Sequence, residues 1–281
     1  MRLVLVLALV VGCGSASPPS AAPPGPPLLE IPAQALPPHG TLMLGDWHGT
    51  REIPAFVGQL VAATAAREPV VLALEIPADV GPAIAAYLAS DGRPARRQAL
   101  IAGAWWREAY QDGRRSVAMA ELIETARALR AAGVAVDIVA FDEASTDSEA
   151  REAAMARNLI AARRARPDAA MIVYAGNLHV SKAEVPFRPG HQWTAMRVAA
   201  AGIPLVSLNA RWTAGTAWIC PDADASHCGA SATRGASAAP PGIHLEPSPD
   251  GKYDGWFGVG AISASPPVAF SALAGAAASP R

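Results

Sequence analysis

Five short apolar segments, separated by stretches with helical periodicity, constrain the fold of this chain most. They span residues 41–44, 70–76, 134–141, 170–175 and 204–208. Runs of Val, Ile and Leu of this length are typical of strands that are covered on both faces. Between them, apolar residues recur every three or four positions over 53–65, 116–132, 148–166 and 193–201, which indicates amphipathic helices. This alternation predicts an α/β fold with a mostly parallel sheet and helices on both faces.

Two regions depart from this alternation. The connection over 90–115 is longer than an ordinary loop, so we expect a helical insertion there. Its Trp105 and Trp106 either bind a ring-shaped or peptide ligand above a site or form the core of the insertion. From Arg211 onward the chain is rich in Gly, Ser, Pro and Ala, and we expect a loop-rich appendage with a small hairpin near 256–262, packed on the sheet edge.

The N-terminus carries an export signal. The chain starts with a positive charge and continues with a compact apolar stretch over 3–11. The run from Val10 to Cys13, at the end of this stretch, resembles the lipobox of bacterial lipoproteins. The resemblance implies a signal peptide over 1–12, cleavage before Cys13 and acylation of that cysteine, which anchors the protein in a membrane. An ordinary secretory signal is the alternative, and both export the chain. Gly14 in place of an aspartate favours the outer membrane.

The remaining composition sets the domain limits and excludes one class of partner. Residues 13–40 are mostly Pro, Ala, Ser and Gly and are expected to form a tether, followed by a single domain over 41–281. The 23 basic and 24 acidic residues give a net charge of −1, so nucleic acid is not expected as a partner. Cys220 and Cys228 are expected to form a disulfide in an oxidising compartment, and a metal site with His227 is the alternative.

Polar side chains that follow the predicted strands are the candidates for chemistry. Asp46 and His48 follow the first strand, Glu75 ends the second, and His179 follows the fourth. Ligands of open parallel sheets bind beyond the carboxyl ends of the strands, so these groups are expected to meet. Asp142, directly after the third strand, is a further candidate. Two histidines with carboxylates suit a general base or a divalent metal.

Each of these residues also has a purely structural explanation. A neighbouring Glu75 or Asp46 would fix the tautomer of His48 and raise its basicity. A single histidine after a strand is, however, often a hydrogen-bonded structural residue. Glu75, within an apolar strand, needs a partner, and an arginine from the 93–115 region would satisfy it equally well.

The motifs also resemble a known family. Gly45-Asp46-Trp47-His48-Gly49-Thr50-Arg51-Glu52, a strand ending in Leu74-Glu75, and a second Gly-x-x-His at 176–179 are similar to motifs of the superfamily that contains erythromycin esterases, ChaN-type haem-binding lipoproteins and Tiki/TraB proteins. The resemblance covers roughly 42–208 and implies an α/β fold. It further implies that His48 is a catalytic base or metal ligand, Glu75 its carboxylate partner and His179 the second histidine. The family usually has Glu where this chain has the shorter Asp46.

Two functions follow as hypotheses. In the first, the protein is an exported hydrolase of ester or amide bonds that acts on a small molecule or peptide, with Asp46, His48, Glu75 and His179 as catalytic residues. His179 then either stabilises the oxyanion or shares a divalent transition metal with His48 and Glu75. In the second, the protein catalyses nothing and binds haem or another small ligand through His48 and His179.

Overall fold

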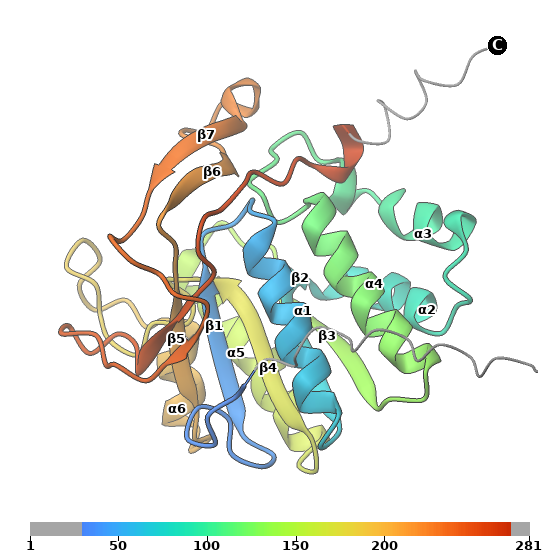
Figure 1. Ribbon diagram of the computed structural model, residues 1–281. Coiled ribbons are helices and arrows are strands. Elements are labelled where there is room, and N and C mark those ends of the chain that lie inside the picture. Colours follow the sequence, from blue (N-terminus) through green and yellow to red (C-terminus); the bar gives the residue numbers. More distant parts are fainter. Residues whose placement is uncertain (1–29, 271–281) are drawn as a thin grey trace, which may run out of the picture.

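A seven-stranded sheet forms the centre of the protein (Figure 1). The structure is a computed structural model and describes residues 30–270. Neighbouring strands pair in parallel, in the order β3-β2-β4-β1-β5-β9, and β8 adds an antiparallel edge. The strands are β1 (Thr41–Asp46), β2 (Val70–Pro77), β3 (Val136–Asp142), β4 (Ala170–Gly176), β5 (Val206–Arg211), β8 (Gly242–His244) and β9 (Gly255–Gly258). The predicted mostly parallel α/β sheet is confirmed.

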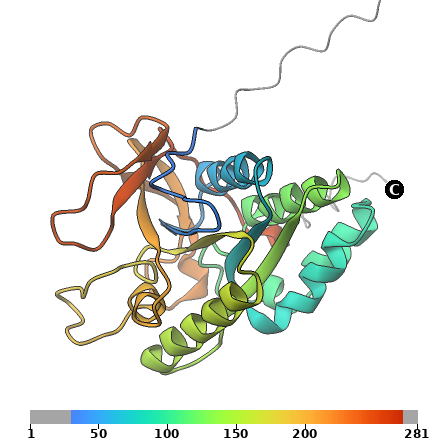
Figure 2. The same ribbon diagram turned by 90° about the horizontal axis from the view of Figure 1, so that it is seen from below.

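Helices cover both faces of the sheet (Figure 2). They are α1 (Glu52–Ala65), α2 (Gly81–Leu88), α3 (Pro94–Ile101), α4 (Val117–Ala131), α5 (Ser148–Ala165) and α6 (Thr194–Ala200). One apolar core joins α1, α2 and α4 to the sheet, and a second joins α5 and α6 to its other face. The sheet is thus buried on both sides, as the uninterrupted apolar segments predict.

Local sequence explains the main boundaries. Gly133, two residues after the last residue of α4, has φ +84°, a backbone conformation that favours glycine and that ends the helix. Asp147 begins α5, because its carboxylate accepts the backbone N–H groups of Glu149 and Ala150. The helical insertion contains α3 and a short turn at Trp105–Arg107. Both tryptophans are buried, 7% and 1% exposed, so they belong to the core of the insertion.

The C-terminal region differs from the prediction in one respect. The expected hairpin at 256–262 is wrong, because β9 pairs in parallel with β5 and antiparallel with the preceding β8. Phe257 is fully buried and stacks on Phe56 at 5.0 Å between ring centroids, which makes this segment part of the core. A separate two-stranded ribbon, β6 (Ala214–Ile219) with β7 (Gly229–Arg234), projects from the loop-rich region.

The N-terminal predictions lie largely outside the described residues. The signal peptide over 1–12, Cys13 and most of the tether belong to this part of the chain. Parts of the last ten residues of the predicted tether contact the domain: Leu36 is 3% exposed in the core, and the backbone N–H of Met171 donates to the carbonyl of Gly40. Among residues 30–270, no helix has the length and apolar character needed to span a membrane.

Candidate active site

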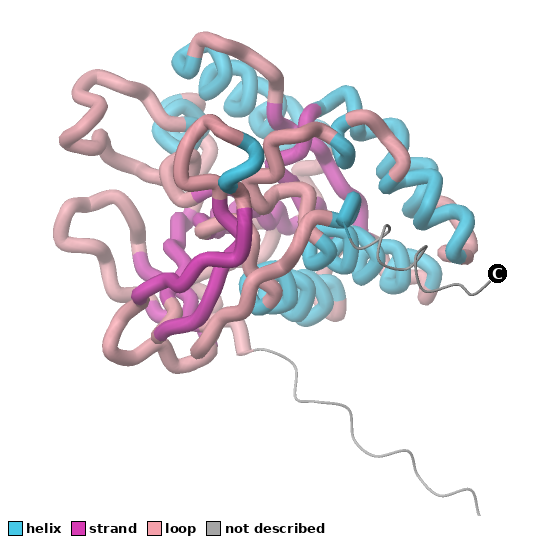
Figure 3. The backbone as a smooth tube through the Cα atoms, turned by 90° about the horizontal axis from the view of Figure 1, so that it is seen from above, coloured by secondary structure: helices cyan, strands magenta, loops and turns pink. Residues whose placement is uncertain are grey.

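The carboxyl ends of the parallel strands meet at one rim of the sheet, seen from above in Figure 3. Loops after the strands, the first turns of α5 and the end of the insertion also reach this rim. Together they supply the side chains of the site, namely Asp46, His48, Glu75, Asp112, Arg114, Asp142, Arg151, Glu152 and His179. All four residues predicted as catalytic are therefore brought together.

Glu75 lies at the centre of the site, and both histidines face it. Nε2 of His48 lies 3.4 Å from Oε2 of Glu75, and Nε2 of His179 lies 3.4 Å from Oε1. The backbone N–H of Gly176 donates a 2.7 Å hydrogen bond to Oε2. Glu75 is only 2% exposed, whereas the imidazoles keep 20% and 14% of their side-chain surface. Solvent thus reaches the imidazoles, and the carboxylate lies beneath them.

A second carboxylate holds the other side of each imidazole. Nδ1 of His48 lies 2.7 Å from Oδ1 of Asp46, and Nδ1 of His179 lies 2.7 Å from Oε1 of Glu152. The His179 contact has hydrogen-bond geometry and the His48 contact is a close ion pair, and in both the carboxylate favours a proton on Nδ1 while Nε2 faces Glu75. The shorter side chain at Asp46 therefore still reaches its histidine.

A hydroxyl group in turn holds each of these outer carboxylates. The Tyr174 hydroxyl donates to Oδ2 of Asp46. The Thr194 hydroxyl donates to Oε2 of Glu152 at 2.6 Å, and the Thr194 backbone N–H donates to the same oxygen at 2.8 Å. The result is two matched arms, each of hydroxyl, carboxylate and imidazole, that converge on Glu75.

Two arginines balance the negative charge. Nη2 of Arg151 donates to Oε1 of Glu75 at 2.9 Å, and Nη1 of Arg114 donates to the same oxygen at 3.2 Å. Both guanidinium groups also donate to Asp142, and Arg114 donates to Asp112. The arginine expected from the 93–115 region is thus Arg114, and it joins the histidines around Glu75 instead of replacing them.

Close backbone approach makes room for the cluster. A Cβ atom on Gly176 would lie 3.1 Å from Nε2 of His48 and 3.5 Å from Oε2 of Glu75. Glycine at the end of β4 therefore allows the backbone N–H to contact the central carboxylate. The site continues into a cavity of 570 Å³ whose lining includes Arg114, Asp142 and Arg151.

The electrostatic environment favours protonated imidazoles. Burial lowers the pKa of His48, but the carboxylates of Asp46 and Glu75 outweigh burial and hold it well above its ordinary value of 6.5. Burial likewise opposes protonation of His179, yet Glu75 and Glu152 raise its pKa to about 9. Burial raises the pKa of Glu75, and the two imidazolium groups overcome that effect and hold it well below 4.5. Glu75 is therefore anionic and both histidines are cationic at neutral pH.

This donor set does not suit the expected divalent metal. The oxygens of Glu75 already accept from Gly176, Arg114 and Arg151, and the guanidinium charges repel a further cation. In the described part of the chain, no group of three or more His, Cys, Asp or Glu side chains is arranged to hold a metal ion. The expected ligation by His48, His179 and Glu75 finds no support in this geometry.

Haem binding finds no support either. An axial ligand must present an imidazole nitrogen lone pair to the iron, and the porphyrin needs an apolar slot. Nε2 of His48 and Nε2 of His179 both face a carboxylate, and carboxylates and guanidinium groups surround the two rings.

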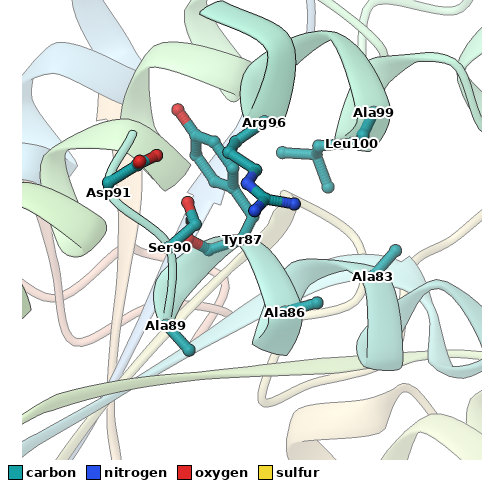
Figure 4. A pocket seen from close by; sticks show the side chains of 9 residues that line it. All are labelled: Ala83, Ala86, Tyr87, Ala89, Ser90, Asp91, Arg96, Ala99 and Leu100. Atoms are coloured by element: carbon teal, nitrogen blue, oxygen red, sulfur yellow. Dashed lines mark hydrogen bonds between the residues drawn. The ribbon is translucent and has the colours of Figure 1, made fainter. Parts of the chain in front are cut away.

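The remaining predictions concern other parts of the molecule. Cys220 and Cys228 form a disulfide, as predicted, so they are not metal ligands with His227. A cavity of 520 Å³ lies between α2 and α3, lined by small side chains with Tyr87 and Arg96 (Figure 4). None of its lining residues belongs to the site around Glu75.

Sequence reasoning missed five supporting residues, namely Asp112, Arg151, Glu152, Tyr174 and Thr194. One of them left a readable signal: Glu152 precedes Ala156 by four and Leu159 by seven positions, so it lies on the apolar stripe of α5. A carboxylate on a buried helix face needs a partner. Tyr174, the one hydroxyl-bearing side chain of β4, is a weaker signal of the same kind.

Comparisons with known proteins concern the fold. No family model matches the chain, and no curated protein matches its sequence. A mutant erythromycin esterase in its open conformation superposes with a TM-score of 0.54 at 10% identity, over 72% of this chain and 78% of that one. A succinoglycan biosynthesis protein gives 0.52 at 12% identity, over 66% and 69%.

A protein from Bacillus cereus gives a TM-score of 0.51 at 12% identity and covers 80% of this chain and 89% of its own. At such low identity the likeness concerns the backbone arrangement alone. The chain thus shares its fold with structures that include an erythromycin esterase, in agreement with the superfamily that its motifs resemble.

Proposed function

We propose that this protein hydrolyses ester or amide bonds at the site around Glu75. One observation carries the proposal: two imidazoles from distant parts of the chain face the two oxygens of one buried carboxylate, and a further carboxylate orients each imidazole. Such an arrangement fixes tautomers and places two proton-transfer groups side by side. The fold shared with an erythromycin esterase supports a hydrolase.

The two histidines have different roles in this reaction. His48, oriented by Asp46, accepts a proton from water as the water oxygen attacks the carbonyl carbon, and returns that proton to the leaving group when the bond breaks. His179 stays protonated and stabilises the negative charge that develops on the carbonyl oxygen. Because the pKa of His48 is raised, its basic form is a minor fraction at neutral pH, and hydrolysis should accelerate as the pH rises above 7.

Substitution of His48 tests the proposal. A panel of p-nitrophenyl esters and amino-acid p-nitroanilides, assayed with the full chain, identifies a substrate. His48→Ala should then lower kcat/KM about 10²- to 10⁴-fold, the usual contribution of a general base, with an unchanged circular-dichroism melt. His227→Ala, an exposed histidine on a loop, is the matched control and should keep full activity. Wild-type turnover in His48→Ala would refute the role.

We also propose that the protein is exported and lipid-anchored through Cys13, most consistently in the outer membrane. The lipobox-like run before Cys13 and the disulfide between Cys220 and Cys228, which needs an oxidising compartment, support this. Mass spectrometry of the membrane-extracted protein should find acyl chains on Cys13, and Cys13→Ala should abolish them. Recovery of a protein that still carries residues 1–12 and an unmodified Cys13 would contradict the proposal.

A further inference from the structure

A second cavity shares a wall with the site. It measures 680 Å³ and lies between the segment after β4 and the segment that leads into β9. Asn177 and Leu178 line it, and they belong to the turn whose first residue, Gly176, donates to Glu75 and which leads into His179. A ligand group in this cavity therefore lies against the turn that carries a catalytic histidine.

Hydrogen bonds fix the cavity against this turn. The Tyr253 hydroxyl donates to the carbonyl of Asn177 at 3.0 Å. Lys182, just after the turn, donates to Asp254 at 2.7 Å, and the same carboxylate accepts the backbone N–H of Ser207 in the segment that opens β5. These bonds hold the cavity wall against the turn, as a substrate-positioning subsite requires.

The cavity is lined by two basic and two acidic side chains, namely Arg211, Lys252, Glu246 and Asp250. The guanidinium of Arg211 lies 4.1 Å above the ring of Trp256, and Glu246 accepts the indole N–H of Trp256. Lys252 pairs with Asp250 at 2.7 Å. Arg211 and Lys252 are thus balanced by Glu246 and Asp250, and the lining has no excess of one sign of charge that would favour a carboxylate, a phosphate or an amine as the ligand.

The groups that remain for a ligand are amides and one aromatic ring. Asn177 and Asn209 line the cavity, and within residues 30–270 their side-chain amides form no hydrogen bond in the structure. A carboxamide both donates and accepts, as a hydroxyl group does. Phe187 lines the same cavity with 70% of its surface exposed and offers a flat apolar face. Amides and an exposed aromatic face in one cavity match a ring that carries hydroxyls at its edge and C–H groups on its face.

We propose that this cavity binds a neutral sugar ring, and that the substrate is an ester of a sugar hydroxyl. The second part rests on the proposed hydrolase function. In the reaction, water adds to the acyl carbon, the bond between that carbon and the sugar oxygen breaks, and the sugar oxygen takes a proton, which yields a carboxylic acid and the free sugar. The cavity holds the leaving alcohol, and the site around Glu75 acts on the acyl group.

Binding measured without catalysis tests the first part. Glucose, N-acetylglucosamine and their β-linked oligomers are titrated into the full chain, with calorimetry and the side-chain amide NMR signals of Asn177 and Asn209 as readouts. We expect saturable binding that shifts both amide signals and weakens about tenfold in Phe187→Ala and in Asn209→Ala. Phe270→Ala, an exposed aromatic outside the cavity, is the matched control.

The results separate this inference from the proposed function. His48→Ala should bind the oligomers as the wild type does, because His48 does not line the cavity. If the protein binds the oligomers saturably but does not hydrolyse acetylated oligomers, the assignment of the cavity as a sugar site stands and the sugar ester is rejected as the substrate. The absence of saturable binding to the wild type, or binding that Phe187→Ala and Asn209→Ala leave unchanged, would overturn the assignment of the cavity.

Discussion

The two arms of the site have the same chemistry but different supports. In the His48 arm, Asp46 ends β1 and Tyr174 lies on the adjacent β4, so the paired strands fix the positions of both groups. In the His179 arm, Glu152 comes from α5 and Thr194 begins α6. The first arm thus depends on the sheet, and the second depends on how two helices pack against each other.

Their charges differ as well. Nη1 of Arg151 lies 3.4 Å from Nε2 of His179 and disfavours a proton there, whereas His48 has Asp46, Glu75 and the nearby Asp112 around it. In the His179 arm, the guanidinium of Arg151 therefore opposes protonation of the imidazole. The two imidazoles therefore differ in the charged groups beside them.

Replacing the shared carboxylate should have the largest effect, because it breaks both arms at once. Glu75→Gln leaves Arg114 and Arg151 with one fewer counter-charge in a buried place, so we expect a loss of about 3–5 kcal/mol in the free energy of unfolding and no measurable hydrolysis. Urea denaturation measures the first effect. Glu143→Gln, close in sequence to Asp142, is the control and should change stability little; equal effects of the two variants would contradict the central place of Glu75.

Removing one outer carboxylate should affect one arm only. Glu152→Gln takes away a group that raises the pKa of His179, so this pKa should fall from about 9 toward 6.5, and that of His48 should stay raised. Asp46→Asn should do the reverse. Imidazole NMR titrations of the two variants measure both values. If either variant shifts both histidines equally, the arms are not independent.

The pH dependence of stability should report the His179 arm. The pKa of His179 in the folded protein, about 9, exceeds the ordinary value of 6.5. The protonated imidazole therefore stabilises the fold fully below pH 6.5. This contribution to the free energy of unfolding, about 3 kcal/mol for the full pKa shift, is lost as the pH rises through 9. Glu75, with its lowered pKa, adds stability above 4.5 that is lost in acid. The urea concentration at the unfolding midpoint should thus decrease as the pH rises from 6.5 to 9, and this decrease should be smaller in His179→Gln. An equal decrease in the variant and the wild type would contradict the contribution of His179.

The hydroxyl groups at the ends of the arms should have the smallest effects. Tyr174→Phe removes a hydrogen bond to the buried Asp46, which costs about 1–2 kcal/mol. Thr194→Val should cost less, because the Thr194 backbone N–H still donates to the same oxygen of Glu152. Thermal melts of the two variants compare the arms directly, and a larger loss in Thr194→Val would reverse the ranking.

The sequence predicts the sheet-borne part of the site better than the helix-borne part. Asp46, His48, Glu75 and His179 follow strand signals, and the carboxyl ends of parallel strands always share an edge. The contribution of α5 depends on how that helix is rotated against the sheet, which places Arg151 and Glu152 at the rim. Local periodicity identifies the helix but does not tell which distant histidine a buried carboxylate meets.

The C-terminal region shows the same limit. The aromatic residues 256 and 257 are apparent as anchors in the sequence, yet their strand pairs with β5, about fifty positions earlier in the chain. The residues near this strand give no sequence signal of a pairing with β5, so the local sequence favours a hairpin. The disulfide was predictable because two cysteines eight positions apart have few other partners in the chain.

Imidazole titration by NMR, in the wild type and in Glu75→Gln, measures the shared contact itself. Because both histidines owe part of their raised pKa to the same carboxylate, we predict that both keep their protons well above pH 6.5 in the wild type and that both pKa values fall in Glu75→Gln. A wild-type histidine that titrates near 6.5, or a Glu75→Gln variant in which only one of the two values moves, would contradict a site built on Glu75.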